Sequence, residues 1–262
     1  MSVRPAAVAG SFYPDNASEL RRAVQEHVAA ARVENVTPKA LIAPHAGYKY
    51  SGPVAGTAYK AIEPLRGTIT GVVLIGPSHR IGFDGLAVSS ASSFATPLGN
   101  VPIDKAGIDR ARVFPQVIVL DRAHAQEHSL EVHLPFLQEV VGQFSLVPIV
   151  TGDAAASEVG QVIEELWGGS ETLIVISSDL SHYHDYHSAA RMDAATSRAI
   201  EALRGEDIAD DHACGCVAIR GLLWAARRRG LQGRTLDLRS SGDTAGTPDR
   251  VVGYGAYAFT EG

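Results

Sequence analysis

Three apolar segments of the chain each lead into a histidine, and this pattern limits the possible folds more than any other feature. The segments span residues 39–44, 71–77 and 172–177, and the histidines that follow them are His45, His79 and His182. Short apolar runs of this kind are typical of buried β-strands. In open α/β sheets, ligands bind beyond the carboxyl ends of the strands, where loops from different strands converge. We therefore expect one shared site built around the three histidines.

Predicted helices and strands alternate along the rest of the chain. We expect helices over residues 19–31, 54–62, 134–141, 157–167, 189–203 and within 213–228. Further strands are expected over residues 86–90, 117–120, 146–150, 235–239 and 251–259. Pro53 is expected as the first residue of its helix, and residues 92–109 as loops and turns. The alternation predicts a single α/β domain over residues 1–262, with a mainly parallel or mixed sheet covered by helices on both faces.

Composition excludes several classes of protein. The 262 residues are 45% hydrophobic and 20% charged, which is ordinary for a globular protein. With a net charge of -6 and no basic stripe, we expect no nucleic-acid partner. No apolar run approaches the ~20 residues that cross a bilayer, and a cleavable leader pattern is absent, so we expect a cytoplasmic protein without a membrane partner.

The segment that carries His182 holds further polar residues. Asp179 lies three residues earlier and could orient a histidine or take a proton, although an aspartate at this position can also simply form a turn. His184 and His187 extend the segment to His-x-His-x-x-His. We expect two of these three histidines to face solvent, so that the three do not form a metal site of their own.

The cysteines are too close in sequence to close a long loop, so a disulfide framework is not indicated. Cys214 lies just ahead of a predicted helix, where amide dipoles can stabilise a thiolate. A thiolate is a soft metal ligand, and with two histidines it would leave coordination positions open. The alternative is a small buried residue, and we expect this for Cys216.

The segment around His128 and His133 excludes one familiar zinc motif. Its pattern is His-x-x-Glu-x-His, whereas a zincin helix needs histidines four residues apart with glutamate after the first. Glu127, Glu131 and these two histidines could instead line the substrate side of the pocket together with Tyr48, or pack as a polar core. Glycine-rich nucleotide-binding motifs are also missing, so a nucleotide cofactor has no support.

Seven ordered motifs cover nearly the whole chain. They lie at residues 4–14, 43–52, 76–79, 127–136, 177–182, 213–215 and 241–254. In these seven motifs the chain resembles the Memo family, whose prokaryotic members are called AmmeMemoRadiSam system protein B. The resemblance implies a fold similar to the catalytic subunit of class III extradiol ring-cleaving dioxygenases, which hold iron(II) with two histidines and a glutamate.

The resemblance also implies roles for individual residues. His45 and His79 would be metal ligands, Cys214 would replace the carboxylate, and His182 would be the acid/base histidine. Because a thiolate prefers softer ions, copper(I) or zinc would compete with iron. The family name further implies a radical S-adenosylmethionine enzyme and a companion-domain protein as partners. Some eukaryotic members are described as signalling scaffolds that bind copper or iron.

Together these observations predict a mononuclear metal protein. We expect iron(II) or copper, with zinc as a further possibility, held by His45, His79 and Cys214, with His182 shuttling a proton and Asp179 behind it. The expected activity is a dioxygenase-like oxidoreduction of a small molecule. The alternatives are a non-enzymatic scaffold that binds metal or peptide, and a zinc-dependent hydrolase.

Overall fold

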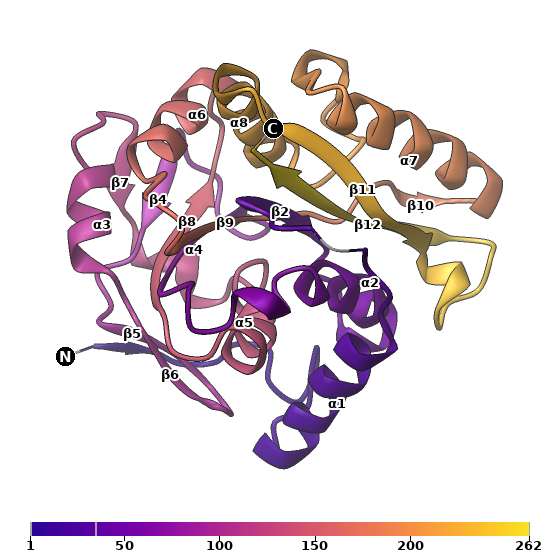
Figure 1. Cartoon of the computed structure of the whole chain (residues 1–262), viewed down its shortest axis with the longest axis horizontal. Coiled ribbons are helices and arrows are strands. Elements are labelled where there is room, and N and C mark those ends of the chain that lie inside the picture. The colour runs from indigo at the N-terminus through magenta and orange to yellow at the C-terminus, as the bar shows by residue number, and fades with distance from the viewer. Residues whose placement is uncertain (1, 35, 262) are drawn as a thin grey trace.

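A computed structural model describes residues 2–34 and 36–261. Within them, a nine-stranded sheet runs in the order β10-β12-β2-β9-β3-β8-β4-β7, with β11 paired to β12 (Figure 1). The central strands are β2 (Ala40–Ala43), β9 (Thr172–Ser177), β3 (Gly71–Pro77) and β8 (Ser145–Thr151). Toward the edges lie β4 (Leu86–Val88), β7 (Val117–Val119), β10 (His182–His184), β11 (Gln232–Ser240) and β12 (Val251–Thr260).

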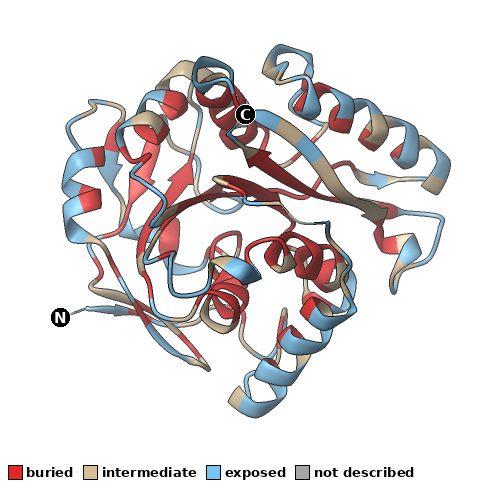
Figure 2. Ribbon diagram, viewed as in Figure 1, coloured by how far each residue is buried: buried red, intermediate tan, exposed pale blue. Residues whose placement is uncertain are grey.

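The four central strands are parallel to one another, which explains their apolar sequences. Parallel strands are covered on both faces, so nearly every side chain must be apolar. All four residues of β2 are buried, as are the last six of β3 (Figure 2). The mixed character of the sheet, predicted from the sequence, comes from the antiparallel pairs that β12 forms with β10, β11 and β2, and from the antiparallel pair of β4 with β8; β4 and β7 are parallel.

Helices cover both faces of the sheet (Figure 1). On one side lie α1 (Ala17–Ala30), α2 (Tyr48–Lys60) and α5 (Leu134–Val140). On the other lie α6 (Ala156–Glu165), α7 (Tyr186–Glu201) and α8 (Cys216–Arg229). Shorter helices are α3 (Lys105–Ala111), α4 (Asp121–Ala125), η1 (Glu63–Leu65), η2 (Glu131–His133), η3 (Gly205–Asp207) and η4 (Ser241–Asp243). No helix among the described residues is long and apolar enough to span a bilayer.

The prediction of loops and turns over residues 92–109 was wrong. This stretch contains the hairpin of β5 (Ser93–Thr96) and β6 (Gly99–Pro102), followed by α3, and β1 (Val3–Arg4) joins the hairpin in a three-stranded sheet. Phe94 and Val101 are buried while their neighbours are not, which is the alternation of a half-buried strand. Gly99, the first residue of β6, has φ +118°, a conformation that favours glycine. The glycine that suggested a loop therefore lets the chain turn from β5 into β6.

The predicted start of the second helix was also wrong. Helix α2 begins at Tyr48, and Pro53 lies inside it rather than at its first position. Tertiary packing maintains the helix across the proline. Gly52 and Gly56 face His27 of α1 so closely that a Cβ at either position would collide with that residue. The two glycines therefore serve close helix packing and do not end the helix.

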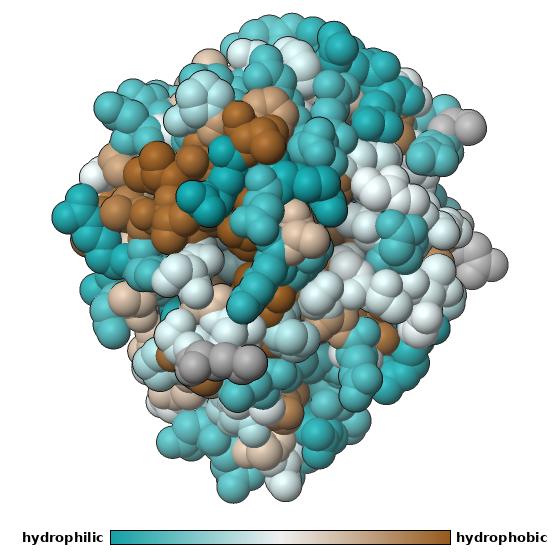
Figure 3. Space-filling view, turned by 90° about the vertical axis from the view of Figure 1, so that its left-hand side faces the viewer, coloured by the Kyte–Doolittle hydropathy of each residue, from teal (hydrophilic) through white to brown (hydrophobic). Residues whose placement is uncertain are grey.

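The open edge of the large sheet carries an apolar patch. Strand β7 pairs only with β4 among the described residues, and Ile118 and Val119 are partly exposed on it. Val113, before β7, and Val3 of β1 are also exposed. Figure 3 views the molecule from this side and shows apolar surface gathered there. Because the edge strand is only three residues long, it offers little unpaired backbone to another chain.

Candidate metal centre

Three histidines converge beyond the carboxyl ends of the central strands. His45 follows β2, His79 follows β3, and His128 lies between α4 and η2. One ring nitrogen of each lies within 4.8 Å of the other two. The ring centroids are 5.1 Å apart for His45 and His79, and 4.6 Å apart for His79 and His128. Three imidazoles at this spacing can hold a transition-metal ion.

The tautomer of His45 follows from its hydrogen bonds. The Ser177 hydroxyl donates its single proton to the Ser129 carbonyl at 2.6 Å, so it must accept from His45 Nδ1, also at 2.6 Å. This leaves the lone pair of Nε2 free. Burial, and then the neighbouring imidazoles, hold the pKa of His45 well below its usual range. His45 is therefore neutral near pH 7, which is the form that binds a metal.

Glu127 orients the other two histidines. Its Oε1 accepts a hydrogen bond from His79 Nδ1 at 2.9 Å and lies 3.3 Å from His128 Nδ1, so both rings leave Nε2 unpaired. Main-chain amides of His79, His128 and Ser129 also donate to this carboxylate. Burial alone would raise the pKa of Glu127, but the hydrogen bonds and charge of His79 and the amides lower it to about 2. The group is an ionised carboxylate that fixes two imidazoles together.

His128 remains neutral in this setting. Burial, and then the charge of His79, lowers the pKa of His128 to about 4. Its ring also packs 4.7 Å from that of Phe12, in the loop before α1. The sequence placed His128 on the substrate side or in a polar core, whereas the structure brings it into the histidine cluster. The only signal in the sequence was the adjacent Glu127, a carboxylate next to a possible ligand.

Cys214 lies directly beside His45. Its Sγ is 3.3 Å from His45 Nε2 and 3.6 Å from the Asp179 carbonyl oxygen, so the single thiol proton has two acceptors within reach. Two ligands of one tetrahedral ion, with bonds of about 2.1 and 2.3 Å, would be roughly 3.6 Å apart. The Cys214 amide donates to the Asp179 carbonyl at 3.3 Å, which sets the position of the side chain. Cys214 therefore has a suitable distance to His45 alone: it falls outside the group of three histidines whose ligand atoms all lie within 4.8 Å of one another, so its role as a metal ligand stays a prediction.

The sequence argument that a helix stabilises a thiolate at Cys214 does not hold. Helix α8 starts two residues later, at Cys216. Burial, and then the charge of Asp179, raise the pKa of the Cys214 thiol. A bound cation would therefore have to displace the thiol proton for this residue to bind it.

Asp179 fixes the loop that carries His45. The side chain is buried, and its Oδ1 accepts hydrogen bonds from the amides of His45 at 2.8 Å and Ala46 at 3.3 Å. Burial raises the pKa of Asp179 to about 6, although these amides and His182 act in the opposite direction. Within the described residues no hydrogen bond joins the Asp179 carboxylate to His182. Asp179 thus holds the main chain at His45, whereas the ring of His45 is held by Ser177, and a role of Asp179 beside His182 stays a prediction.

His182 lies at the rim rather than at the centre. It is the first residue of β10, is half-buried, and is held by pairing with Val252 of β12. The preceding amide, that of Ser181, donates to Asp193 Oδ1 on α7 at 3.0 Å. His184 and His187 follow at the surface, outside the three-histidine cluster. Cys216 is buried, and its thiol faces Asp210 at 3.7 Å.

Tyr48 and His133 lie in the polar core behind the cluster. The Tyr48 hydroxyl donates to the Val132 carbonyl at 2.8 Å, and His133 Nδ1 is 2.8 Å from the Tyr59 hydroxyl. Both side chains are buried. The polar-core alternative describes their surroundings, so a direct role in binding substrate stays a prediction for Tyr48 and His133.

Glu131 of η2 stabilises this polar core through its contacts with the N-terminal segment. Its carboxylate forms a buried ion pair with Arg4 and accepts hydrogen bonds from the amides of Ala7 and Val8 and from the Tyr13 hydroxyl. The pair anchors the N-terminal segment against η2. The sequence left Glu131 either on the substrate side of the pocket or in a polar core, and it gave no sign of the partner Arg4, which is 127 positions away.

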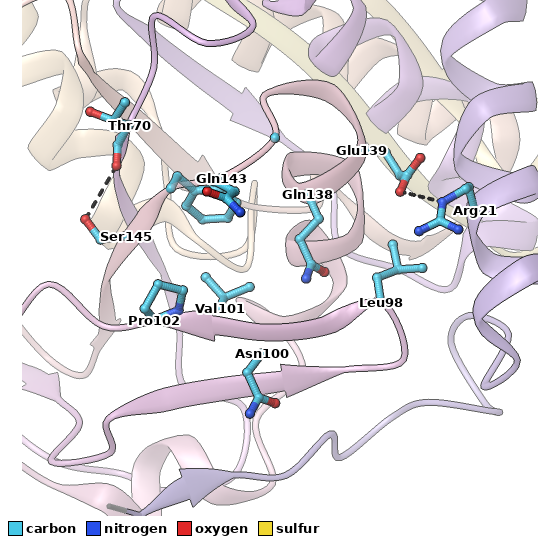
Figure 4. A pocket seen from close by; sticks show the side chains of 12 residues that line it. Arg21, Thr70, Leu98, Asn100, Val101, Pro102, Gln138, Glu139, Gln143 and Ser145 are labelled. Carbon is cyan, nitrogen blue, oxygen red and sulfur yellow. Dashed lines mark hydrogen bonds and ion pairs between the residues drawn. The ribbon is translucent and has the colours of Figure 1, made fainter.

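A large open hollow lies at the opposite end of the sheet. Its volume is about 740 Å³, and it lies where Thr70 and Ser145 begin the path of β3 and β8 (Figure 4). Arg21 on its wall is already paired with Glu139 at 3.0 Å. Amide side chains, those of Asn100, Gln138 and Gln143, provide most of the remaining polarity. None of the residues predicted to form a site lines this hollow.

The fold and the three imidazoles define an α/β protein with a candidate metal centre at the carboxyl edge of its sheet. Comparisons with known proteins agree with this class. The family model described as "Memo-like protein" matches residues 4–258, so the chain belongs to the Memo family. A MEMO1 family protein of Aquifex aeolicus is 36% identical, over 97% of this chain and 98% of that protein. One from Nitrosopumilus maritimus is 32% identical, over 98% and 99%.

A solved structure supports the fold alone. The chain is similar to the "uncharacterized protein JW3007 from Escherichia coli K12", with a TM-score of 0.54 and 12% identity. The match covers 82% of this chain and 98% of that protein. At this level of identity, the similarity carries no information about ligands or activity.

Proposed function

We propose that the protein binds one transition-metal ion and catalyses a dioxygenase-like oxidation of a small molecule. His45, His79 and Cys214 would hold the ion, with His128 as a fourth donor beside them. The observation that carries the proposal is the orientation of the imidazoles. Nδ1 of each ring is turned to Ser177 or Glu127, and within the described residues Nε2 has no partner in His79 and His128 and contacts only the Cys214 thiol in His45. Iron(II) or copper suits this mixed nitrogen and sulfur set, and zinc is also compatible with it.

A bound ion of this kind would polarise a substrate oxygen and take part in electron transfer. The protein's own residues would hold the ligand rings in place and move a proton. Glu127 and Ser177 keep the ligand rings in place without any rearrangement during turnover. His182, at the rim, would move a proton to or from the substrate, and Asp193 would hold its loop in position through the Ser181 amide.

A zinc hydrolase is the second candidate, and one observation favours it. Three imidazoles around one point match the His₃ ligand set of zinc enzymes that activate water. In that case the thiol of Cys214, whose pKa is raised by burial, would stay protonated. The two candidates therefore differ in whether Cys214 contributes to metal binding.

Elemental analysis of anaerobically purified protein tests both. We expect about one metal ion per chain in the wild type, with a large loss in His45→Ala and His79→Ala. His187→Ala, on the exposed side of α7, is the matched control and should retain the metal. A loss of metal in Cys214→Ser supports the proposed ligand set, whereas retained zinc with ester hydrolysis supports the hydrolase. A wild-type protein without bound metal, and with no uptake after incubation with iron, copper or zinc, would contradict both.

A further inference from the structure

A second cavity, separate from the hollow of Figure 4, lies at the amino end of the central strands. Its volume is about 630 Å³. Lys39, the residue before β2, and Thr172, the first residue of β9, both line it. Trp167, which follows α6, and Arg229, the last residue of α8, complete one wall. None of these residues belongs to the candidate metal centre, so a ligand bound here would not need the metal ion.

Lys39 holds its ammonium group in a fixed position at the wall of this cavity. Nζ donates to the main-chain carbonyls of Gly169 at 2.6 Å and Thr172 at 2.7 Å. An ammonium has three N–H groups, so one has no acceptor among the described residues. Burial lowers the pKa of Lys39 to about 8, although Glu171 and Glu261 act in the opposite direction. The half-buried ammonium is therefore short of a neutralising negative charge.

The indole of Trp167 holds a second cation beside the first. Lys39 Nζ lies 5.4 Å from the centroid of the ring, and the guanidinium carbon of Arg229 lies 4.3 Å from it. Both cations are attracted to the aromatic face. Trp167 is only 6% exposed, so the ring supports the two cations and offers little surface to a ligand. Because both distances are measured to one indole, the ammonium and the guanidinium are neighbours, and an anion that contacts both would reduce their mutual repulsion.

The acidic residues nearby do not neutralise these two cations. Within the described part of the chain, neither Lys39 nor Arg229 forms an ion pair, whereas the neighbouring Arg228 does. The carboxylate of Glu171 turns back onto its own loop, where it accepts from a main-chain amide at 2.8 Å and a threonine hydroxyl at 2.9 Å. Glu261 lines the cavity but forms no ion pair with either cation in the part that the structure describes. Two neighbouring cations thus face an open cavity with donor groups to spare.

We propose that this cavity is a second ligand site, which binds a small anion through Lys39 and Arg229. The ligand carries a carboxylate or a phosphate group, whose oxygens accept from the remaining N–H of Lys39 and from the guanidinium of Arg229. Hydrogen bonds between charged groups of this kind are the strong ones in proteins. The volume of about 630 Å³ is that of a site for a small molecule. The inference goes beyond the proposed function and does not depend on it.

Binding of simple probes tests the ligand class. Isothermal titration of the wild type, as isolated and after removal of metal by a chelator, would use succinate, inorganic phosphate and neutral succinamide. We expect at least one anion to bind about tenfold or more tightly than succinamide, because the neutral probe cannot accept charge-assisted hydrogen bonds. The tighter anion identifies the group as a carboxylate or a phosphate. Equal affinity for all three probes, or no binding of either anion, would overturn the inference.

The fluorescence of Trp167 locates the bound anion. The chain has two tryptophans, so in Trp224→Phe the only indole is the one that supports Lys39 and Arg229. The tighter anion should change the emission of this variant with the affinity found by titration, and succinamide should not. Binding by titration without any change in emission would place the anion elsewhere and contradict the inference.

Two variants test the cations themselves. Arg229→Gln should weaken binding of the anion about tenfold. Arg228→Gln is the matched control and should leave binding unchanged, because Arg228 is already paired with Glu164 at 3.1 Å. Lys39→Gln should also weaken binding. This variant loses two bonds to main-chain carbonyls, so the exposed Arg229 gives the test that does not disturb the fold. Unchanged affinity in Arg229→Gln would contradict the inference.

The pH dependence tests the role of Lys39. Since its pKa is lowered to about 8, succinate binding should weaken as the pH rises through this value and the ammonium loses its proton. The other charged groups at the cavity are Arg229, Glu171 and Glu261. Lys39→Arg separates Lys39 from them, because a guanidinium stays charged and the affinity should then remain constant from pH 7 to pH 9. A wild-type affinity that does not change over this range would argue against Lys39.

His79→Ala separates this cavity from the metal centre. Succinate binding should be unchanged in His79→Ala, and Arg229→Gln should keep the metal content of the wild type. Loss of succinate binding in His79→Ala would place the anion at the metal centre and overturn the inference. A wild type that binds succinate here but holds no metal would leave the inference standing while the metal proposal fails.

Discussion

The two ends of the sheet differ in what their side chains are free to do. At the amino end the hollow of about 740 Å³ is roomy, but its charged groups, Arg21 and Glu139, are already paired with each other. At the carboxyl end, partners hold three imidazoles by one nitrogen, and the other nitrogen of each ring has no partner in the described residues or, in His45, only the Cys214 thiol. The comparison teaches that oriented donor atoms, rather than open volume, distinguish the candidate site of this protein.

The largest expected difference between the two ends is the response to metal. At a free metal concentration of 100 times the dissociation constant, binding should stabilise the fold by about 2.7 kcal/mol. Denaturant unfolding with and without the ion measures this. The effect should vanish in His79→Ala and persist in Gln138→Ala at the other end. Loss of the effect in Gln138→Ala alone would reverse the assignment of the two ends.

A smaller effect is expected when the ligands stay and their support is removed. Glu127→Gln keeps the size of the side chain, but a neutral amide cannot accept all the hydrogen bonds that the carboxylate accepts from His79 and the surrounding main-chain amides. Metal affinity should fall about 10- to 100-fold, the usual range for loss of a group that orients ligands. Competition with a chromophoric chelator gives the dissociation constant. Glu139→Gln is the control, and affinity unchanged in Glu127→Gln would argue against the orienting role.

Acid should destabilise the metal-free protein through His124 of α4, a buried residue outside the histidine cluster whose Nε2 lies 3.0 Å from the Ala87 carbonyl oxygen. Burial lowers the pKa of His124 to about 4. Between pH 6.5 and 4 the unfolded chain therefore binds a proton there that the folded chain does not, so stability falls as the pH falls through this window. From pH 7 to 5 the contribution of this residue is about 2 kcal/mol.

Urea unfolding at pH 7 and pH 5 tests this contribution. The drop in wild-type stability should be larger than the drop in His124→Gln, because the variant has no imidazole to protonate. Identical drops in the two proteins would show that His124 does not carry the pH dependence. The surface variant Arg21→Ala should keep the wild-type drop.

The smallest effect is expected at the amino end itself. Arg21→Ala removes a partly exposed ion pair with Glu139, and such pairs contribute roughly 0 to 1 kcal/mol. Thermal unfolding should therefore change by only a few degrees, and metal content should not change. A loss of metal in this variant would mean that the two ends of the sheet are coupled.

The central sheet and two of the three histidines could be predicted from sequence. Parallel strands carry an apolar signature because both of their faces are buried, and their carboxyl ends meet at one edge. That is why His45 and His79 lie together. His128 could not be placed in this way, because it follows no strand and its position depends on how Glu127 folds back onto His79.

Other parts of the prediction failed for identifiable reasons. The hairpin over residues 93–102 is short, and its glycine and proline resemble those of an irregular loop. Helix α2 continues through Pro53 because of its packing against α1, and such packing is not visible in local sequence. The prediction of a thiolate at Cys214 failed because burial raises the pKa of the thiol, and the residues on either side do not reveal that burial.

The carboxylate of Glu127 serves two rings at once, and this has an evolutionary consequence. A single nucleotide change in this one codon would alter the support of two imidazoles together, so selection on either ring acts on the same residue.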